Sequence, residues 1–334
     1  MNGDLVAGLS RFLSDDIGRT VPVSDVQPLS AGARRRNIAF DADLGGCVLR
    51  LVATLVPPSI QLLPVEVEAG VRELAREHDV PVPHVLAVCT DTGYVGEPFM
   101  LSERLDGETV PRRVLRLVQQ SGNGDLIAEQ LGRAMGSLHA IDPDKASPDL
   151  PGRADVDPAE ALLTEAESQV SHLLPDRPVF ALALRWLTRN LPSSPDRLTL
   201  VHTDIRNGNL IIGPEGLRAV LDWEGTQRYG DPMRDAAWSA LRMWRFGLDD
   251  REIGGFSTRS PFLRGYASAG GTFDPDRFRW WKVACTLAWG TMLATQTAAF
   301  LDGTVPNIVM AASGRRIPEI EWDLLMQTRP TASR

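Results

Sequence analysis

The N-terminal third of the chain consists of short apolar runs separated by turn residues. Apolar residues recur at helical spacing over 5–13, which predicts a helix there. A second helix is expected over 64–77, and the Val-Pro-Val-Pro stretch at 80–83 ends it because proline removes backbone donors. Further segments have the composition of strands: 26–41, 46–52, 84–89 and 98–105. This third is therefore predicted to be rich in β-sheet.

After residue 105 the pattern becomes helical. The segment 125–140 places its apolar residues on one face of a helix, and a longer helix is predicted over 276–300. The tryptophans of that second helix recur at helical spacing, which favours a place in the core. Strand-like exceptions at 198–202, 210–212 and 217–223 flank a polar segment. We expect a mostly helical region with small β elements inserted.

The composition narrows the class of protein. The 334 residues are 43% hydrophobic and 23% charged, as in folded globular proteins. A net charge of −8 provides no basic field for nucleic acid. The three cysteines lie too far apart for a zinc or disulfide framework. No apolar run reaches the ~20 residues that span a bilayer, and residues 1–16 lack the basic start and apolar run typical of a signal peptide. A cytoplasmic protein without nucleic acid or membrane partners is expected.

The polar segment between the strand-like runs carries the candidate chemistry. It contains His202, Asp204 and Asn209 in the pattern His-x-Asp-x-x-x-x-Asn, and Asp222 lies near the end of the strand-like run 217–223. Phosphoryl transfer needs a carboxylate that orients and deprotonates the attacking hydroxyl, and oxygen ligands for Mg²⁺. These residues supply that set. Asn, Asp and Gly are also ordinary turn residues, but the assembled pattern favours phosphoryl transfer.

This pattern resembles that of the aminoglycoside phosphotransferase and choline kinase superfamily, whose fold is similar to that of protein kinases. Other matching segments are 29–33, 48–50, 80–83 and 230–235. A narrower likeness, carried by 99–113, Arg206 and the tail 314–325, is to the bacterial branch related to the kinase-like domain of some acyl-CoA dehydrogenases. The resemblance implies an α+β, two-lobe protein-kinase-like fold. The N-terminal lobe (1–104) would hold a small antiparallel β-sheet, and the C-terminal lobe (105–334) would be mostly helical.

The resemblance also implies roles in catalysis. Asp204 would be the base that orients the hydroxyl, and Asn209 with Asp222 would hold Mg²⁺. Arg206 is placed to neutralise the charge developing on the γ-phosphate, the alternative being a solvated loop cation. His202 would fix the loop by hydrogen bonds. The neighbouring Glu224 either touches a second metal ion or faces solvent.

Nucleotide binding is implied for the N-terminal lobe. Arg50 stands where many relatives carry a phosphate-binding lysine, so we expect it to hold the α- and β-phosphates and to pair with Glu68; Glu66 is the alternative partner. Gly32 belongs to a loop that would cradle phosphates, and the arginines that follow it either add charge there or form a solvated face. The adenine would bind at an interlobe hinge that contains Ser102, Glu103 and Leu105.

The expected reaction uses ATP and Mg²⁺ and a small-molecule hydroxyl acceptor, and the preference for ATP over GTP stays open. The acceptor would be a hydroxyacyl-type metabolite, such as a CoA thioester, or an aminoglycoside-like antibiotic. It would bind in the C-terminal lobe, with these candidates: Arg228, Asp231, Trp238, Arg242, Trp289, Arg315 and Arg316. The alternative is a catalytically weak, pseudokinase-like nucleotide-binding module, because Arg50 replaces the lysine and Thr203 replaces the usual glycine. The protein would be a monomer or a homodimer.

Overall fold

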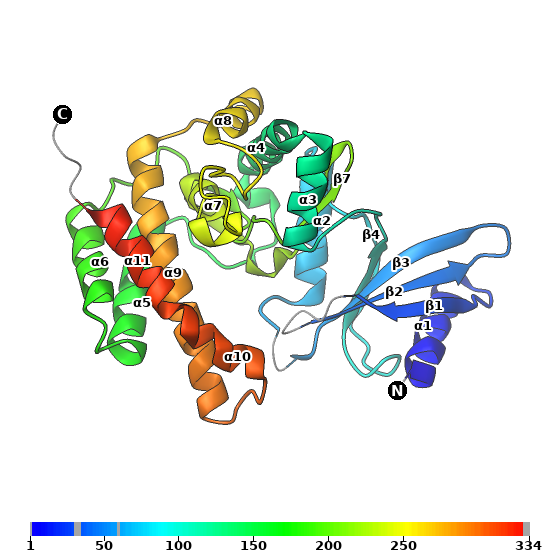
Figure 1. Cartoon of the computed structure of the whole chain (residues 1–334). Coiled ribbons are helices and arrows are strands. Elements are labelled where there is room, and N and C mark those ends of the chain that lie inside the picture. The colour runs from blue at the N-terminus through cyan, green and yellow to red at the C-terminus, as the bar shows by residue number, and fades with distance from the viewer. Residues whose placement is uncertain (1, 30–34, 59–60, 330–334) are drawn as a thin grey trace.

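The computed structural model describes residues 2–29, 35–58 and 61–329, and places a β-sheet at one end of the molecule and helices at the other (Figure 1). The sheet is antiparallel, with the strand order β1-β2-β3-β5-β4. Its strands are β1 (Val23–Pro28), β2 (Arg36–Asp43), β3 (Val48–Leu55), β4 (Val85–Cys89) and β5 (Phe99–Glu103). The segment 26–41, predicted as one strand, belongs instead to β1 and β2, with residues 30–34 outside the described part.

The two faces of this sheet have different partners. Leu51, Ala53 and Leu55 alternate along β3 toward one face, where they form a core with Leu9 and Leu13 of α1 (Asn2–Ile17). The intervening residues of β3 point to the opposite face. There Met100 packs with Val56 and with Val65, the first residue of α2 (Val65–Glu77). The N-terminal end of α2 therefore lies near the C-terminal end of β3.

The rest of the chain is built from helices around one large apolar core. They are α3 (Pro111–Ser121), α4 (Gly124–Ala140), α5 (Pro158–Leu173), α6 (Pro178–Arg189), α7 (Pro232–Ser239), α8 (Arg259–Ser268), α9 (Pro275–Leu301), α10 (Ile308–Ser313) and α11 (Ile317–Thr328). The predicted helices over 125–140 and 276–300 are confirmed as α4 and α9. Trp280 and Trp281 of α9 are fully buried, as expected for core residues.

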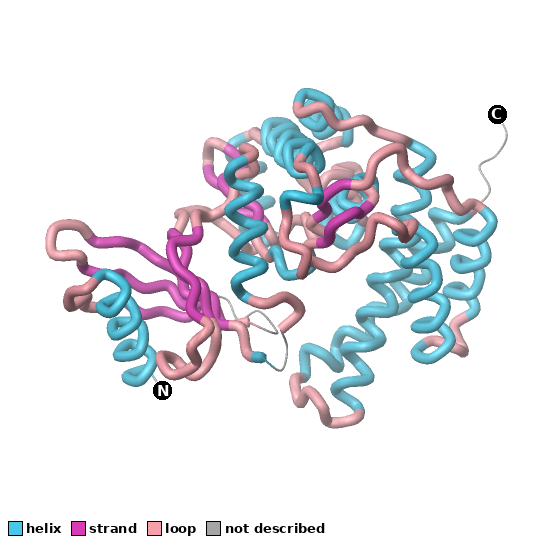
Figure 2. The backbone as a smooth tube through the Cα atoms, turned by 180° about the vertical axis from the view of Figure 1, so that it is seen from behind, coloured by secondary structure: helices cyan, strands magenta, loops and turns pink. Residues whose placement is uncertain are grey.

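Two short two-stranded sheets among these helices position the polar segment (Figure 2). β6 (Thr199–Val201) pairs with β9 (Gln227–Gly230), and β7 (Leu210–Gly213) pairs with β8 (Gly216–Val220). The loop 202–209 leads from β6 to β7. An antiparallel β-bridge between Ile212 and Glu108 joins β7 to the segment that follows the five-stranded sheet. The loop is thus anchored at both ends. Within the described ranges, no helix has the length and apolar character needed to cross a membrane.

Candidate active site

A buried carboxylate anchors the polar loop. Asp235 of α7 is fully buried and accepts hydrogen bonds from the backbone N–H groups of His202 (2.8 Å) and Thr203 (2.7 Å). His139 Nε2 lies 3.2 Å from the same carboxylate, and the Tyr266 hydroxyl lies 2.9 Å from His139 Nδ1. Burial opposes the charge, but His139 and the backbone donors hold the pKa of Asp235 below its usual value. The loop therefore starts on a fixed, ionised support.

His202 is a structural residue of this loop. Its ring is completely buried and packs edge-on against Trp223, with 4.6 Å between ring centroids. Nδ1 accepts from the N–H of Asp204 (3.2 Å), and Nε2 donates to the carbonyl of Leu221 (3.1 Å). Because a backbone N–H only donates and a carbonyl only accepts, these bonds fix a neutral ring with its proton on Nε2. The loop-fixing role expected from the sequence agrees with this geometry.

Thr203 adopts a left-handed backbone conformation, with φ of 72°. That conformation is costly for a β-branched residue and explains why glycine is usual at this position in the resembling proteins. Two hydrogen bonds compensate: the N–H donates to Asp235, and Oγ1 donates to the carbonyl of Gly225 (2.9 Å). The threonine therefore fits the same turn and also ties the loop to the segment after Asp222.

Asp204 follows this turn, and both of its carboxylate oxygens are held. Oδ1 accepts from Trp238 Nε1 (2.7 Å) and Arg206 Nε (2.9 Å), and Oδ2 accepts from Asn209 Nδ2 (2.6 Å). About a quarter of the side chain is exposed, which leaves it open to a reactant (27%). Burial, together with the charge of Asp222, raises the pKa of Asp204, while Arg206 opposes the shift. A carboxylate with raised proton affinity and a fixed orientation suits a general base.

Arg206 is not a freely solvated cation. Its Nε contacts Asp204, and its guanidinium carbon lies 4.5 Å from the centre of the Trp244 ring. Trp244 packs in turn against Trp238 and Trp289, with 5.7 and 5.0 Å between ring centroids. The side chain is thus held between the carboxylate of Asp204 and an aromatic wall formed by these three tryptophans, so the solvated alternative does not apply.

Asn209 directly precedes β7 and Asp222 follows β8, and both provide oxygen atoms of the kind that Mg²⁺ prefers. The N–H of Leu221 donates to the carbonyl of Asn209 (2.8 Å), which holds the residue before Asp222 against Asn209. Asn209 Nδ2 bonds Asp204, so its Oδ1 is the atom left for a ligand. Over the described ranges no cluster of three or more His, Cys, Asp or Glu could bind a metal alone. Mg²⁺ here would need nucleotide and water oxygens as well, which is usual for this ion.

The expected pair between Arg50 and Glu68 is wrong. Arg50 is exposed and pairs with Asp106, with Nη1 2.9 Å from Oδ2. The reason is its position along the strand: the carbonyl of Arg50 accepts from the N–H of Arg104, so it lies at the hinge end of β3. Residues 50 to 54 span about 13 Å of strand, which separates Arg50 from the end where α2 begins.

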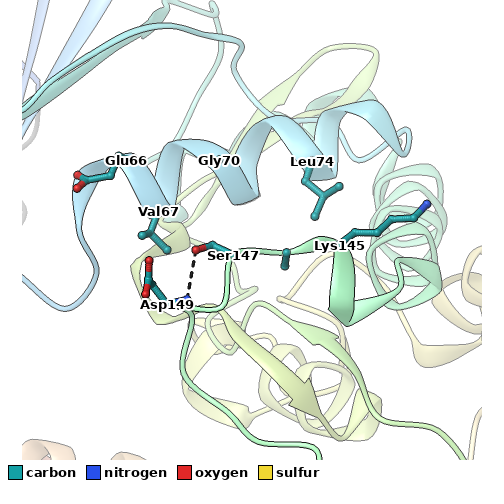
Figure 3. A pocket seen from close by; sticks show the side chains of 8 residues that line it. Glu66, Val67, Gly70, Leu74, Lys145, Ser147 and Asp149 are labelled. Carbon is teal, nitrogen blue, oxygen red and sulfur yellow. Dashed lines mark hydrogen bonds between the residues drawn. The ribbon is translucent and has the colours of Figure 1, made fainter.

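Glu68 pairs instead with Arg35, the residue that precedes β2. Arg35 Nη1 lies 2.6 Å from Glu68 Oε2, and Arg35 Nε lies 2.7 Å from Glu224 Oε2. The alternative partner, Glu66, is exposed and lines a small cavity of about 300 Å³ between α2 and residues 145–149 (Figure 3). Residues two positions apart on a helix face different directions, which explains the choice of Glu68. The role of Arg35 was missed because nothing in the sequence separates it from its two arginine neighbours.

The predicted hinge residues lie at the end of β5 and directly after it. Ser102 and Glu103 are the last two residues of that strand, and Glu103 Oε1 accepts from the N–H of His84 (2.9 Å). The backbone N–H and carbonyl of Leu105 make no hydrogen bond with any residue in the described part. Gly32 lies outside the described residues, so its place in a phosphate loop stays a prediction.

The acceptor candidates separate into two groups. Trp238 and Trp289 belong to the aromatic wall beside Asp204. Four of the others make ion pairs: Arg228 with Asp144, Asp231 with Arg277, Arg242 with Asp323, and Arg316 with Glu319. Arg315 is exposed and makes no ion pair or hydrogen bond with another described residue. Trp244 was not among the candidates, because it lies in a short 3₁₀ segment without helical periodicity.

Comparison with known proteins decides the family. The sequence model of the phosphotransferase enzyme family matches residues 25–281 of the chain. The chain belongs to this family. Acyl-CoA dehydrogenase family member 10 of Mus musculus is 27% identical over 285 residues, which cover 80% of this chain and 26% of that protein. Acyl-CoA dehydrogenase family member 11 of Gallus gallus is 28% identical over 164 residues, 48% of this chain and 20% of the relative. The chain thus spans about a quarter of the length of these relatives. The similarity to acyl-CoA dehydrogenase family members that was predicted from the sequence is confirmed.

Solved structures confirm the fold class of the phosphotransferase. The aminoglycoside phosphotransferase APH(4)-Ia, in a ternary complex with AMP-PNP and hygromycin B, aligns with a TM-score of 0.66 and 19% identity, over 97% of this chain and 99% of that one. Macrolide 2'-phosphotransferase type I aligns with a TM-score of 0.65 and 17% identity, over 92% and 95% of the two chains. The expected two-lobe, protein-kinase-like α+β class is therefore correct.

Proposed function

We propose that this phosphotransferase transfers the γ-phosphoryl group of ATP to a hydroxyl group of a small molecule. The observation that carries the proposal is the arrangement around Asp204. Its carboxylate is oriented by three donors, has a raised pKa, and lies beside the oxygen ligands of Asn209 and Asp222. The likeness to a structure with bound AMP-PNP supports nucleotide binding, and a likeness to a GDP complex makes GTP the competing donor to test.

In the proposed reaction, the acceptor hydroxyl lies against Asp204. Its oxygen forms a bond to the γ-phosphorus as the bond from that phosphorus to the bridging oxygen breaks, and its proton passes to Asp204. ADP leaves with the bridging oxygen. Mg²⁺, held by Asn209 and Asp222, would neutralise charge on the phosphate oxygens. Arg206 lies within hydrogen-bond distance of Asp204 and would release it to meet the charge that develops on the γ-phosphoryl group.

The nucleotide would bind between the lobes at 1–104 and 105–334, with the adenine at the segment formed by Ser102, Glu103 and Leu105. The unpaired backbone groups of Leu105 support this placement. The acceptor would then approach from the helical lobe, where Trp238, Trp244 and Trp289 flank Asp204. An apolar wall beside a hydroxyl-activating carboxylate suits an acceptor with an apolar part.

A groove on the helical lobe supports an anionic acceptor over a cationic antibiotic. It has a volume of about 850 Å³ and lies between α3 and residues 246–256, with Leu115 and Phe246 among its apolar residues. Its charged lining residues are Arg112, Arg116, Arg251, Asp125 and Asp250. Arg251 pairs with Asp250 and Asp125 accepts from the Ser257 hydroxyl, whereas Arg112 and Arg116 make no ion pair or hydrogen bond with other described residues. Asn207 of the catalytic loop donates to the carbonyl of Gly254 (2.9 Å), which ties the loop to this groove. Unpaired arginines beside apolar residues favour phosphate or carboxylate groups on an otherwise apolar acceptor.

The test is transfer of ³²P from [γ-³²P]ATP to a panel of hydroxyacyl-CoA esters and aminoglycosides. We expect phosphorylation of an anionic hydroxyl compound by the wild type and loss of that signal in Asp204→Asn. Asp176→Asn, an exposed change between α5 and α6, is the matched control and should retain full activity. Tight MgATP binding with no transfer to any hydroxyl would favour the nucleotide-binding module instead.

The groove has its own test. Changing Arg112 and Arg116 together to alanine should raise the KM for an anionic acceptor in a salt-dependent way and leave the KM for ATP unchanged. The control changes Arg185 and Arg189 of α6, which are exposed arginines outside the groove. Equal effects of the two double variants would remove the groove from the acceptor site, and efficient phosphorylation of aminoglycosides alone would contradict the anionic class.

A further inference from the structure

We propose that Arg35, and not the arginine of β3, is the cation that binds the phosphates of the nucleotide. This inference deepens the proposed function, because it requires that a nucleotide binds between the two lobes. It moves the phosphate-binding cation from the third strand to the residue that precedes the second strand. The assignment rests on the contacts of Arg35 with Glu68 and Glu224, on its closeness to Asp222, and on the contrasting position of Arg50.

The contacts of Arg35 fix its guanidinium between two carboxylates and leave its Nη2 without an acceptor. Nη1 is 2.6 Å from Glu68 of α2, and Nε is 2.7 Å from Glu224 in the turn after Asp222. The residue is only 9% exposed. Nη2 is buried and makes no hydrogen bond with any other residue in the described part of the chain, and Nε meets Glu224 as an ion pair without the geometry of a hydrogen bond. A buried guanidinium donor without an acceptor is costly, and a phosphate oxygen would satisfy it.

The place of Arg35 matches the place that the phosphates must take. If Asn209 and Asp222 hold Mg²⁺, the phosphates lie beside Asp222. The negative charges of Glu68, Glu224 and Asp222 outweigh the effect of burial and raise the pKa of Arg35, so the side chain stays charged. Arg35 thus joins α2 to the segment that carries the proposed metal ligand.

The third strand offers no such cation. Near the C-terminal end of β3, which is the end toward α2, Thr54 donates through Oγ1 to Asn37 Oδ1 (2.8 Å). An uncharged pair therefore occupies this position. Arg50 lies about 13 Å away along the strand and is held by Asp106 next to the hinge. Arg50 is therefore a natural control: the same residue type on the same sheet, but at the adenine end of the cleft.

The experiment measures the affinities of adenosine, ADP and MgATP by calorimetry. In Arg35→Met we expect the affinities for ADP and MgATP to fall roughly 10- to 100-fold, the effect of one or two charge-assisted hydrogen bonds, with adenosine affinity unchanged. Arg50→Met should show no loss of ADP or MgATP affinity beyond any change in adenosine affinity. Because an arginine fork contacts two carboxylates and a phosphate together, Arg35→Lys should still lose roughly fivefold or more in MgATP affinity.

Two further variants keep the proposal testable if Arg35→Met unfolds because Glu68 and Glu224 lose their partner. Arg35→Lys keeps the positive charge, and Glu68→Gln weakens the same ion-pair network. Each of these variants should lower ADP affinity without lowering adenosine affinity. Equal losses for adenosine and ADP, or a phosphate-selective loss in Arg50→Met, would overturn the assignment of Arg35. A wild-type protein that bound neither ADP nor MgATP would refute the proposed function itself.

Discussion

Replacing Asp235 by asparagine should loosen the catalytic loop at its support. The aspartate accepts from the N–H of His202 through Oδ2 and from the N–H of Thr203 through Oδ1. An asparagine of the same shape accepts on one side only, so its amide hydrogens face one of these N–H groups whichever way the side chain turns. The chain loses a charge-assisted hydrogen bond and buries an unsatisfied donor, which together cost about 2–4 kcal/mol.

The catalytic effect follows from the backbone strain at Thr203. Its left-handed conformation persists because Asp235 and Gly225 hold it, so release of the N–H lets the turn relax and moves the adjacent Asp204. A shift on the order of 1 Å in a catalytic group lowers turnover by up to roughly 100-fold. We therefore expect Asp235→Asn to lose stability and kcat together, with little change in adenosine affinity.

Urea denaturation and steady-state kinetics check this prediction. Tyr266→Phe is the control, because it removes the hydroxyl at the other end of the network and leaves the bonds from Asp235 to the loop. It should cost about 1 kcal/mol, the value of an ordinary hydrogen bond, and leave kcat nearly unchanged. The reasoning is refuted if Asp235→Asn keeps wild-type kcat and lies within about 1 kcal/mol of wild-type stability.

Three further predictions concern residues around Asp204. Asp222→Asn should weaken nucleotide binding only when Mg²⁺ is present; calorimetry showing equal losses with and without the ion would contradict a metal role. A base works only when ionised, so activity falls as the pH drops through the raised pKa of Asp204. Because Arg206 opposes that shift, Arg206→Gln should move the acidic limb of the kcat/KM profile to higher pH, and a limb that stays or moves down would refute this. Trp238→Phe keeps an aromatic side chain but removes the indole N–H that donates to Asp204, so kcat should fall roughly 2- to 10-fold with an unchanged KM for ATP. An equal fall of kcat in Asp176→Asn would mark the loss as nonspecific.

Much of this arrangement could be predicted from local sequence patterns. Helical periodicity located α4 and α9, because their apolar residues face one core. The spacing of Asp204, Asn209 and Asp222 indicated one site, because a short loop between strands can only place such residues together. Resemblance named Glu68 as the acidic partner on α2, and its assignment of the hinge stays a prediction.

The partner of Glu68 could not be predicted in the same way. Strand alternation tells which face Arg50 occupies, but the distance from Arg50 to α2 depends on where that helix packs along β3. Arg35 stands among identical neighbours and precedes a strand, so its burial is a tertiary property. The aromatic wall was only partly predicted for a related reason: Trp244 meets Trp238 and Trp289 across elements far apart in the sequence.

The most direct test of the central claim is the transfer of labelled γ-phosphate to a hydroxyl acceptor by the wild type and by Asp204→Asn, each with matched MgATP affinity measured in parallel. We expect the wild type to phosphorylate an anionic hydroxyl compound, and Asp204→Asn to bind MgATP normally while transferring label at a rate lower by roughly two powers of ten or more. Equal transfer rates in the two proteins would contradict the account, because the carboxylate of Asp204 would then take no part in the reaction.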